Sequence, residues 1–243
     1  MNCIAHRGSA NRVPENSMAG IHDTAAQQIK QIECDISVAA DGVAVIFHDE
    51  SLRRMTGDPR SVLSLTSAEL TQIPLMTHHI CPTQYIPLAE QWMRAAKNQD
   101  LFLHLEIKVH DQEVQRVVDA TLDAFDRAEL KASQVRLSSF SFDVIQLIRG
   151  CRPELDVGIA TVRLADVPLD ALESLGVVSI HLDIDYLDGQ AIELAVGRGF
   201  KVCAYTVNSA KQLASLPLDL IDSVFTDDPL RLLDELKALK IGY

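Results

Sequence analysis

Residues 101–150 read LFLHLEIKVHDQEVQRVVDATLDAFDRAELKASQVRLSSFSFDVIQLIRG, which is two consecutive repeats of a strand pattern followed by a helix pattern. The apolar runs Leu101–Ile107 and Val135–Ser139 are typical of buried strands. The segments Asp111–Ala128 and Phe142–Gly150 carry apolar residues at helical spacing. Strands that alternate with helices predict a parallel sheet with right-handed crossover connections.

The same alternation continues toward both ends of the chain. It predicts further strands at Cys3–Ala5, Ile32–Ser37, Val157–Thr161, Val177–Leu182, Lys201–Thr206 and Ser223–Thr226. It predicts helices to about Lys30 after a cap at Asn16 or Ser17, and at Leu88–Lys97, Ala165–Leu175, Gly189–Arg198, Ser209–Leu216 and Pro229–Leu239. Eight strand–helix units indicate a closed (β/α)₈ TIM barrel of the α/β class. An open doubly wound sheet would need a glycine-rich loop after the first strand, where Gly8 stands alone. We therefore expect residues 1–243 to form a single TIM-barrel domain.

One segment interrupts this alternation after the second strand. Asp41-Gly42 favours a tight turn, so Val43–Phe47 should form a β-hairpin with the second strand and bring His48 roughly opposite Glu33. Residues from about 50 to 87 then form an irregular insertion in which Thr66–Leu70 makes a short helical turn at most. Long loops in compact domains are usually functional, so the insertion is expected to have a functional role.

Composition limits the classes of partner. The net charge of −12 disfavours nucleic acid and anionic membrane surfaces. No stretch approaches the length of a membrane span, and the first residues, MNCIAHRG, do not resemble a signal peptide. Five cysteines without CxxC spacing argue against a disulfide framework and a structural zinc site. We expect a cytoplasmic protein with a small-molecule substrate and no stable membrane association, whose oligomeric state the sequence does not set.

Polar residues follow the predicted strands, where a TIM barrel carries its site. They include His6, Arg7, Glu33, Asp35, Glu106, Lys108, Ser138, His181, Asp183, Thr206, Asn208 and Asp227. Glu33 and Asp35 lie two residues apart and therefore share one strand face. Carboxylates this close repel each other unless a cation lies between them. His104 shares a face with Glu106, and we interpret it as a hydrogen-bonded core residue.

These residues resemble the glycerophosphodiester phosphodiesterase family, in its short bacterial cytoplasmic type. Nine motifs occur in the family's order and span essentially the whole chain. They are HRG at residues 6–8, PENS at 14–17, ECD at 33–35, DGVAVIFHD at 41–49, LRRMTG at 52–57, LEIK at 105–108, SSF at 138–140, YTVN at 205–208 and TDDP at 226–229.

The resemblance implies a TIM barrel that hydrolyses glycerophosphodiesters to glycerol 3-phosphate and an alcohol, with a divalent cation. By position, three acids match the metal ligands, two histidines match the acid/base pair, and two basic residues match phosphate contacts. The three acids are Glu33, Asp35 and Glu106, the two histidines are His6 and His48, and the two basic residues are Arg7 and Lys108. A set of carboxylates without cysteine suits Mg²⁺ or Ca²⁺.

Two positions depart from the family pattern. Tyr205 stands where a tryptophan is usual, and this change is expected to alter the pocket for the alcohol portion, which Tyr205 should border from the end of its strand. Residues 220–222, Leu-Ile-Asp, replace a usual Gly-Val-Asp, and this change should affect only loop shape.

Two alternatives remain open. A phosphodiesterase of the lysophospholipase D type would need an apolar rim near residues 50–87, where the sequence is rather polar. A barrel that binds phosphate ligands without catalysis would be expected to lack His6, His48 or a metal acid, and all are present.

For several other residues of these motifs, the sequence also suggests structural roles. Pro14 and Asn16 resemble the start of a helix, whereas Glu15 could buttress Arg7. Asp227 could orient a cationic side chain or cap the last helix. Asn208 is expected to organise its loop and Trp92 to pack in the core.

Overall fold

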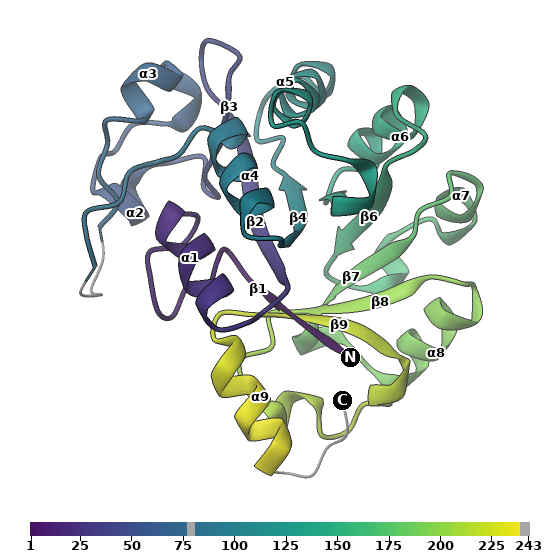
Figure 1. The fold of residues 1–243 in the computed structure, drawn as a ribbon. Helices are drawn as coiled ribbons and strands as arrows, with labels where there is room; N and C mark the ends of the chain where they lie inside the picture. The colour runs from purple at the N-terminus through teal and green to yellow at the C-terminus, as the bar shows by residue number, and fades with distance from the viewer. Residues whose placement is uncertain (77–80, 239–243) are drawn as a thin grey trace.

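The computed structural model describes residues 1–76 and 81–238, and its centre is a closed barrel of parallel strands (Figure 1). The strands follow the order β1-β9-β8-β7-β6-β5-β4-β2, and pairing of β1 with β2 closes the ring. They are β1 (Asn2–Ala5), β2 (Gln31–Val38), β4 (Phe102–Ile107), β5 (Val135–Ser139), β6 (Asp156–Thr161), β7 (Ser179–Asp183), β8 (Lys201–Tyr205) and β9 (Ile221–Thr226). The prediction of a (β/α)₈ TIM barrel is confirmed.

Helices surround the barrel in Figure 1. They are α1 (Met18–Ala26), α4 (Ala89–Asn98), α5 (Val114–Arg127), α6 (Phe142–Cys151), α7 (Leu169–Ser174), α8 (Gly189–Gly197) and α9 (Pro229–Ala238). The insertion adds α2 (Arg53–Thr56) and α3 (Ser67–Leu70), at the upper left of the view. Single turns of 3₁₀ helix are η1 (Val62–Ser64), η2 (Ala132–Gln134), η3 (Leu164–Asp166), η4 (Ile184–Tyr186), η5 (Ala210–Leu213) and η6 (Leu218–Leu220).

Two predicted helices that adjoin a proline are shorter than expected. The segment predicted as Ser209–Leu216 forms only η5, and Pro217 disfavours the helical conformation of Leu216 directly before it. In the segment predicted as Ala165–Leu175, Pro168 directly precedes α7, so only the second half is α-helical. The last predicted helix is confirmed through its described residues, and its final position, residue 239, lies outside them.

The hairpin after β2 is present. β3 (Ala44–Ile46) pairs antiparallel with β2, with Ile36 opposite Ile46 and Gly42 at a positive φ of 82° in the turn. His48 lies just beyond this ladder, and continuing the register would place it opposite Cys34, one residue from the expected Glu33.

The insertion has a small core of its own beside the main barrel core. Its apolar residues Leu52, Val62, Leu65, Leu70, Leu75 and Ile86 pack against Ala39, Val45 and Phe47 of the hairpin. The predicted short helical turn at Thr66–Leu70 is present as α3, and Thr66 and Glu69 form a capping box at its start. Trp92 is fully buried and donates its indole N–H to the Ser17 carbonyl (3.3 Å), which confirms its packing role.

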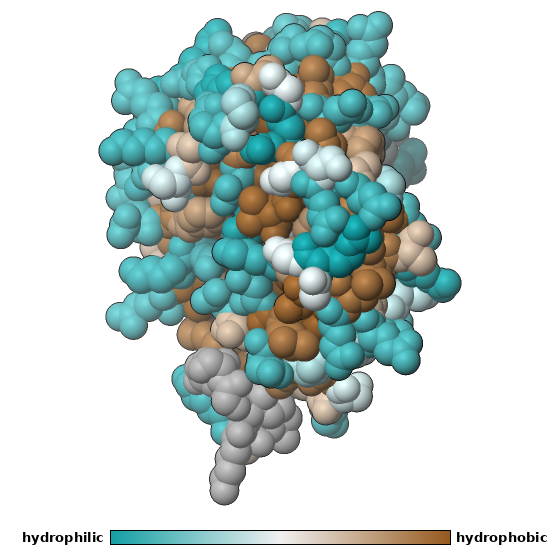
Figure 2. All heavy atoms as spheres, turned by 90° about the vertical axis from the view of Figure 1, so that its right-hand side faces the viewer, coloured by the Kyte–Doolittle hydropathy of each residue, from teal (hydrophilic) through white to brown (hydrophobic). Residues whose placement is uncertain are grey.

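The outer surface is mixed in polarity. On the face that Figure 2 shows, hydrophilic side chains are interspersed with smaller apolar areas. None of the helices in the described ranges 1–76 and 81–238 is long and apolar enough to cross a membrane.

A contact between two glycines anchors the end of β1 to α1. A Cβ atom on Gly20 would lie 2.8 Å from the Gly8 carbonyl oxygen, and one on Gly8 would lie 2.9 Å from the Gly20 Cα. Because both neighbours are backbone atoms, neither can move aside cheaply. Gly8 also has a positive φ of 75°, which favours glycine.

We predict that Gly20→Ala lowers the melting temperature measured by calorimetry, because overpacking costs about 1–3 kcal/mol. The matched control is Gly150→Ala in α6, where an added Cβ meets no atom within 4 Å. This control should raise helix stability by up to about 1 kcal/mol. Equal melting temperatures for the two variants would show that the contact does not constrain the fold.

Candidate active site

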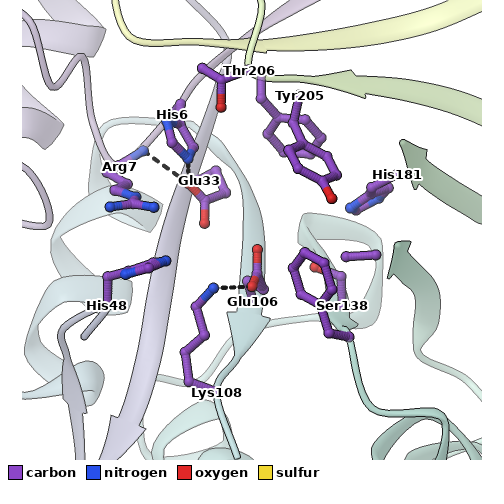
Figure 3. Close-up of a pocket in the computed structure, with 13 residues that line it drawn as sticks. His6, Arg7, Glu33, His48, Glu106, Lys108, Ser138, His181, Tyr205 and Thr206 are labelled. Atoms are coloured by element: carbon purple, nitrogen blue, oxygen red, sulfur yellow. Dashed lines mark hydrogen bonds and ion pairs between the residues drawn. The ribbon is translucent and has the colours of Figure 1, made fainter. Parts of the chain in front are cut away.

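The eight predicted site residues meet at the carboxyl end of the barrel. β1, β2, β4 and β8 and the hairpin position them, and they are His6, Arg7, Glu33, Asp35, His48, Glu106, Lys108 and Tyr205. All except Asp35 line one pocket of about 190 Å³ (Figure 3). Asp35 lies directly behind it, paired with Arg7 and Lys108.

Three carboxylates form an acidic cluster at the wall of this pocket. Glu33, Asp35 and Glu106 each offer an oxygen within 4.8 Å of the others. Glu33 and Asp35 are almost fully buried, and the Glu33 Oε1 atom has no hydrogen-bond partner among the described residues. Burial and then the charge of Asp35 raise the pKa of Glu33 from its ordinary 4.5 to about 8. An unpaired buried carboxylate oxygen beside two more carboxylates fits a hard divalent cation.

Two basic side chains offset part of this negative charge. Lys108 contacts Glu106 and lies 3.1 Å from Asp35 Oδ1, and Arg7 Nε lies 3.2 Å from Asp35 Oδ2. Burial raises the pKa of Asp35, but these two cations outweigh it and hold that pKa well below its usual range. Asp35 is therefore ionised, whereas Glu33 keeps its proton until the pH approaches 8.

Arg7 is held in an uncommon backbone conformation. Its φ of 50° is left-handed, and its backbone N–H donates to Glu33 Oε2 (2.9 Å) while its Nη1 donates to Glu15 Oε1 (3.0 Å). Strained residues persist where surrounding contacts determine them. Glu15 thus buttresses Arg7, as the sequence suggested.

His6 is oriented by a carboxylate from the last strand. Its Nδ1 donates to Asp227 Oδ1 (2.6 Å), and Asn208 Nδ2 donates to Asp227 Oδ2 (2.6 Å). Burial lowers the pKa of His6, but the Asp227 hydrogen bond and the Glu33 charge together raise it above its ordinary value. Of the two roles considered for Asp227, orientation of a cationic side chain is the one its contacts support.

His48 has a similar arrangement. Its Nδ1 donates to Asp49 Oδ1 (2.6 Å), and Arg54 of the insertion donates to both Asp49 and Glu15. Arg54 therefore links the partner of His48 to the partner of Arg7. With Nδ1 occupied in each histidine, Nε2 remains for a ligand.

Asn16 is a site residue that sequence reasoning assigned to the start of a helix. Ser17 is the actual cap of α1. Asn16 instead donates from Nδ2 to Asp35 Oδ2 (2.8 Å) and accepts from the Asp35 backbone N–H (3.2 Å). It has a φ of 56°, and asparagine is enriched in this left-handed region. Asn16 thus fixes both the backbone and the carboxylate of Asp35.

The other side of the pocket has little charge. Tyr205 donates its hydroxyl to the Thr161 carbonyl (3.0 Å), and its ring meets Phe140 edge to face. Phe140 is half exposed at the rim, whereas Ser138 and His181 are buried. The pocket therefore joins a charged side to an aromatic side.

His104 lies deeper in the barrel than the pocket. It is buried, and its Nε2 hydrogen-bonds Gln31 Oε1 (2.8 Å). The interpretation of His104 as a core residue agrees with these contacts.

Comparison with known proteins identifies relatives of similar length. Residues 6–231 match the sequence pattern of the Glycerophosphoryl diester phosphodiesterase family. The glycerophosphodiester phosphodiesterase of Bacillus altitudinis is 24% identical over 234 residues, which cover 93% of this chain and 94% of that protein. The enzyme of the same name from Caldanaerobacter subterraneus subsp. tengcongensis is 22% identical over 228 residues, 93% of each protein.

Solved structures share the fold. A phosphodiesterase of Oleispira antarctica, in complex with the product sn-glycerol-3-phosphate, superposes with a TM-score of 0.87 at 25% identity. The match covers 98% of this chain and 97% of that one. A glycerophosphodiester phosphodiesterase of Parabacteroides distasonis superposes with a TM-score of 0.83 at 22% identity and 98% coverage of both chains.

We predict that a divalent cation and pH act on stability through Glu33. Because its folded pKa of about 8 exceeds the ordinary 4.5, the folded protein holds a proton that the unfolded chain has released. Without a cation, the free energy of unfolding therefore falls as the pH rises from about 4.5 toward 8, because the folded protein must then release this proton from a buried carboxyl. Mg²⁺ or Ca²⁺ binds the ionised carboxylate, so its stabilising effect should grow with pH.

Thermal melts at pH 6 and pH 8.5, with cation or with EDTA, test this prediction. In Glu33→Gln the cation should raise the melting temperature less than in wild type. In EDTA, the melting temperature of this variant should fall less between pH 6 and pH 8.5 than that of wild type. Glu193→Gln, at an exposed position of α8, is the control and should behave like wild type. An undiminished cation shift in Glu33→Gln would remove Glu33 from the cation site.

Proposed function

This chain belongs to the glycerophosphoryl diester phosphodiesterase family of phosphoric diester hydrolases, and we propose that it cleaves glycerophosphodiesters to glycerol 3-phosphate and an alcohol with a divalent cation and two histidines. The observation that carries the proposal is the meeting of His6 and His48 in the pocket of the acidic cluster, each with a carboxylate on Nδ1.

The acidic cluster of Glu33, Asp35 and Glu106 would hold the cation, Mg²⁺ or Ca²⁺. When bound, the cation supplies neutralisation of charge on the phosphoryl oxygens. The identity of the three ligands is supported by the unpaired Glu33 oxygen and by the proximity of the other two carboxylates.

Arg7 and Lys108 bind the phosphate group in this proposal. The planar guanidinium of Arg7 can donate two parallel hydrogen bonds to phosphate oxygens, and Lys108 adds a compact charge. Glu15 fixes the Arg7 fork, so its direction is set before the substrate arrives. This preorganisation lowers the entropy lost on binding.

The two histidines transfer the protons. One removes a proton from the attacking group, which is water or a substrate hydroxyl whose cyclic product water then opens. The other protonates the leaving alkoxide, and imidazole suits both transfers at neutral pH. Asp227 and Asp49 hold Nδ1 of His6 and His48 as donors, so Nε2 is the atom that exchanges the proton. Tyr205, at the aromatic side, borders the alcohol portion of the substrate.

A lysophospholipid is a second candidate substrate, favoured by one observation. Phe140, Val162 and Tyr186 are exposed apolar side chains at the same barrel end as the pocket. Phe140 and Val162 directly follow β5 and β6, and Tyr186 ends η4, which follows β7. The apolar acyl chain of a lysophospholipid is attached to its glycerol, and this chain can lie on such a rim. The sequence led us to expect an apolar rim near residues 50–87, but these side chains lie on the strands opposite that insertion.

We predict that a coupled assay detects glycerol 3-phosphate released from glycerophosphodiesters, and that EDTA abolishes this release. His6→Ala and His48→Ala should each lower kcat about 10²–10⁴-fold, which is the usual contribution of positioned proton transfer. A nitrophenolate leaving group needs little acid assistance, so it should rescue the variant that lacks the acid and not the other. Full turnover in EDTA, or wild-type kcat in both variants, would refute the proposal.

We also predict that Asp227→Asn lowers kcat by about 10–100-fold, a typical effect of losing an orienting partner. Because Asp227 raises the pKa of His6, its loss should move the limb of the pH–rate profile that reports His6 to lower pH. Asp228→Asn is the control, since Asp228 accepts from the Arg231 N–H and makes no contact with His6. An unchanged pH profile in Asp227→Asn would show that Asp227 does not act through His6.

A further inference from the structure

His181 is a buried polar side chain of the pocket that the mechanism does not use. It belongs to β7, is 3% exposed and lines the pocket. Figure 3 shows it on the side opposite Arg7 and His48, next to Tyr205 and Ser138. A polar group buried at a pocket wall costs free energy unless it gains a partner there.

One ring nitrogen of His181 has a protein partner and the other does not. Nε2 lies within hydrogen-bond distance (3.1 Å) of Ser179 Oγ. A Cβ atom on Gly158 would lie 2.5 Å from Ser179 Oγ and 2.9 Å from His181 Nε2, so glycine at this position makes room for the pair. The other nitrogen, Nδ1, has no hydrogen-bond partner in the described chain. It is not fully buried either, so it remains accessible to a ligand. Nδ1 is therefore the nitrogen left for the pocket.

The surroundings keep His181 uncharged. Burial and then the charge of Arg136 lower the pKa of His181 to about 3. The Phe225 ring lies 5.0 Å from the imidazole, between ring centres. A neutral imidazole presents either a donor or an acceptor at its free nitrogen, depending on the tautomer. A hydroxyl group satisfies both cases, because it can accept and donate.

We propose that His181 is the residue that binds the terminal hydroxyl of the glycerol portion and thereby selects glycerol-containing substrates. This inference rests on the proposed function and assigns the glycerol end of the same pocket. The negatively charged phosphate oxygens can bind Arg7 and Lys108, which line the side of the pocket opposite His181. The neutral side is left for a neutral, hydrogen-bonding group.

Burial of the lining residues distinguishes the glycerol end from the alcohol end. Ser138, Ala160, His181 and Phe225 are all buried and close the pocket, whereas Phe140 is half exposed at its mouth. The invariant part of the substrate fits a closed end, since its size does not change. The alcohol portion varies in size among glycerophosphodiesters and fits the open rim.

Two substrates that differ by one hydroxymethyl group test the proposal. Glycerol 4-nitrophenyl phosphate and 2-hydroxyethyl 4-nitrophenyl phosphate release the same nitrophenolate, so absorbance measures both reactions. Wild type should prefer the glycerol ester in kcat/KM. In His181→Leu this preference should fall by about 10–100-fold, as expected for loss of a buried hydrogen bond to a substrate hydroxyl. The rate with the hydroxyethyl ester should change less than about 3-fold.

Product inhibition gives a second measurement that does not depend on the chemical step. Inhibition by glycerol 3-phosphate should weaken in His181→Leu, and inhibition by 2-hydroxyethyl phosphate should not. His181→Gln, which keeps a donor and an acceptor, should restore part of the preference. If His181→Leu does not fold, His181→Met serves instead, because methionine fills irregular space.

His104→Leu is the matched control. His104 is the other buried histidine near Phe225 (5.6 Å between ring centres), but it bonds Gln31 and does not line the pocket. Its replacement should change stability and leave the substrate preference as in wild type. A preference that persists in His181→Leu would overturn the inference, whereas a wild type that hydrolyses neither ester would instead overturn the proposed function.

Discussion

The burial of three carboxylates at one end of the barrel is the constraint on which the site depends. Removing an ion from water costs several kcal/mol even after relaxation, so each carboxylate needs a partner. When Glu33, Asp35 and Glu106 are all ionised, Arg7 and Lys108 supply two positive charges against three negative ones, which leaves one negative charge uncompensated. Without a cation, the proton that Glu33 holds below about pH 8 removes this excess. A divalent cation would change that excess to a single positive charge. A phosphodiester carries a single negative charge, so the proposed cation makes the same site attractive to it.

The insertion contributes orientation rather than binding energy. Arg54 joins Asp49, the partner of His48, to Glu15, the partner of Arg7. Its side chain is 46% exposed, and exposed ion pairs add about 1 kcal/mol at most to stability. Their value here is geometric, because one guanidinium fixes the relative placement of a proton-transfer group and a phosphate-binding group. The small apolar core under the insertion holds α2 in position for this contact.

The sequence predicts the fold well because strand and helix periodicities are local, whereas the orienting contacts are long-range. Asn16 follows Pro-Glu and precedes Ser17, a pattern that a helix start alone would also produce. Its contact with Asp35 depends on the left-handed turn at residues 7–9. The His6–Asp227 pair spans 221 positions, yet barrel closure could have indicated it. Since β1 must pair with β9, the residues that follow Ala5 and Thr226 are necessarily neighbours.

Closure also explains why the pocket divides into two chemically different sides. The charged groups come from β1, β2, β4 and the hairpin, which are adjacent around the ring, and β5 to β9 supply the neutral ones. Charges gathered on one arc compensate one another at contact distance, so the opposite arc need carry no charge. Residues such as Phe140 and Tyr205 can therefore change with the alcohol portion without disturbing the balance among the carboxylates. A tyrosine at position 205, where the family resemblance leads one to expect tryptophan, is a change of this kind: it remains aromatic and adds a hydroxyl that the Thr161 carbonyl satisfies.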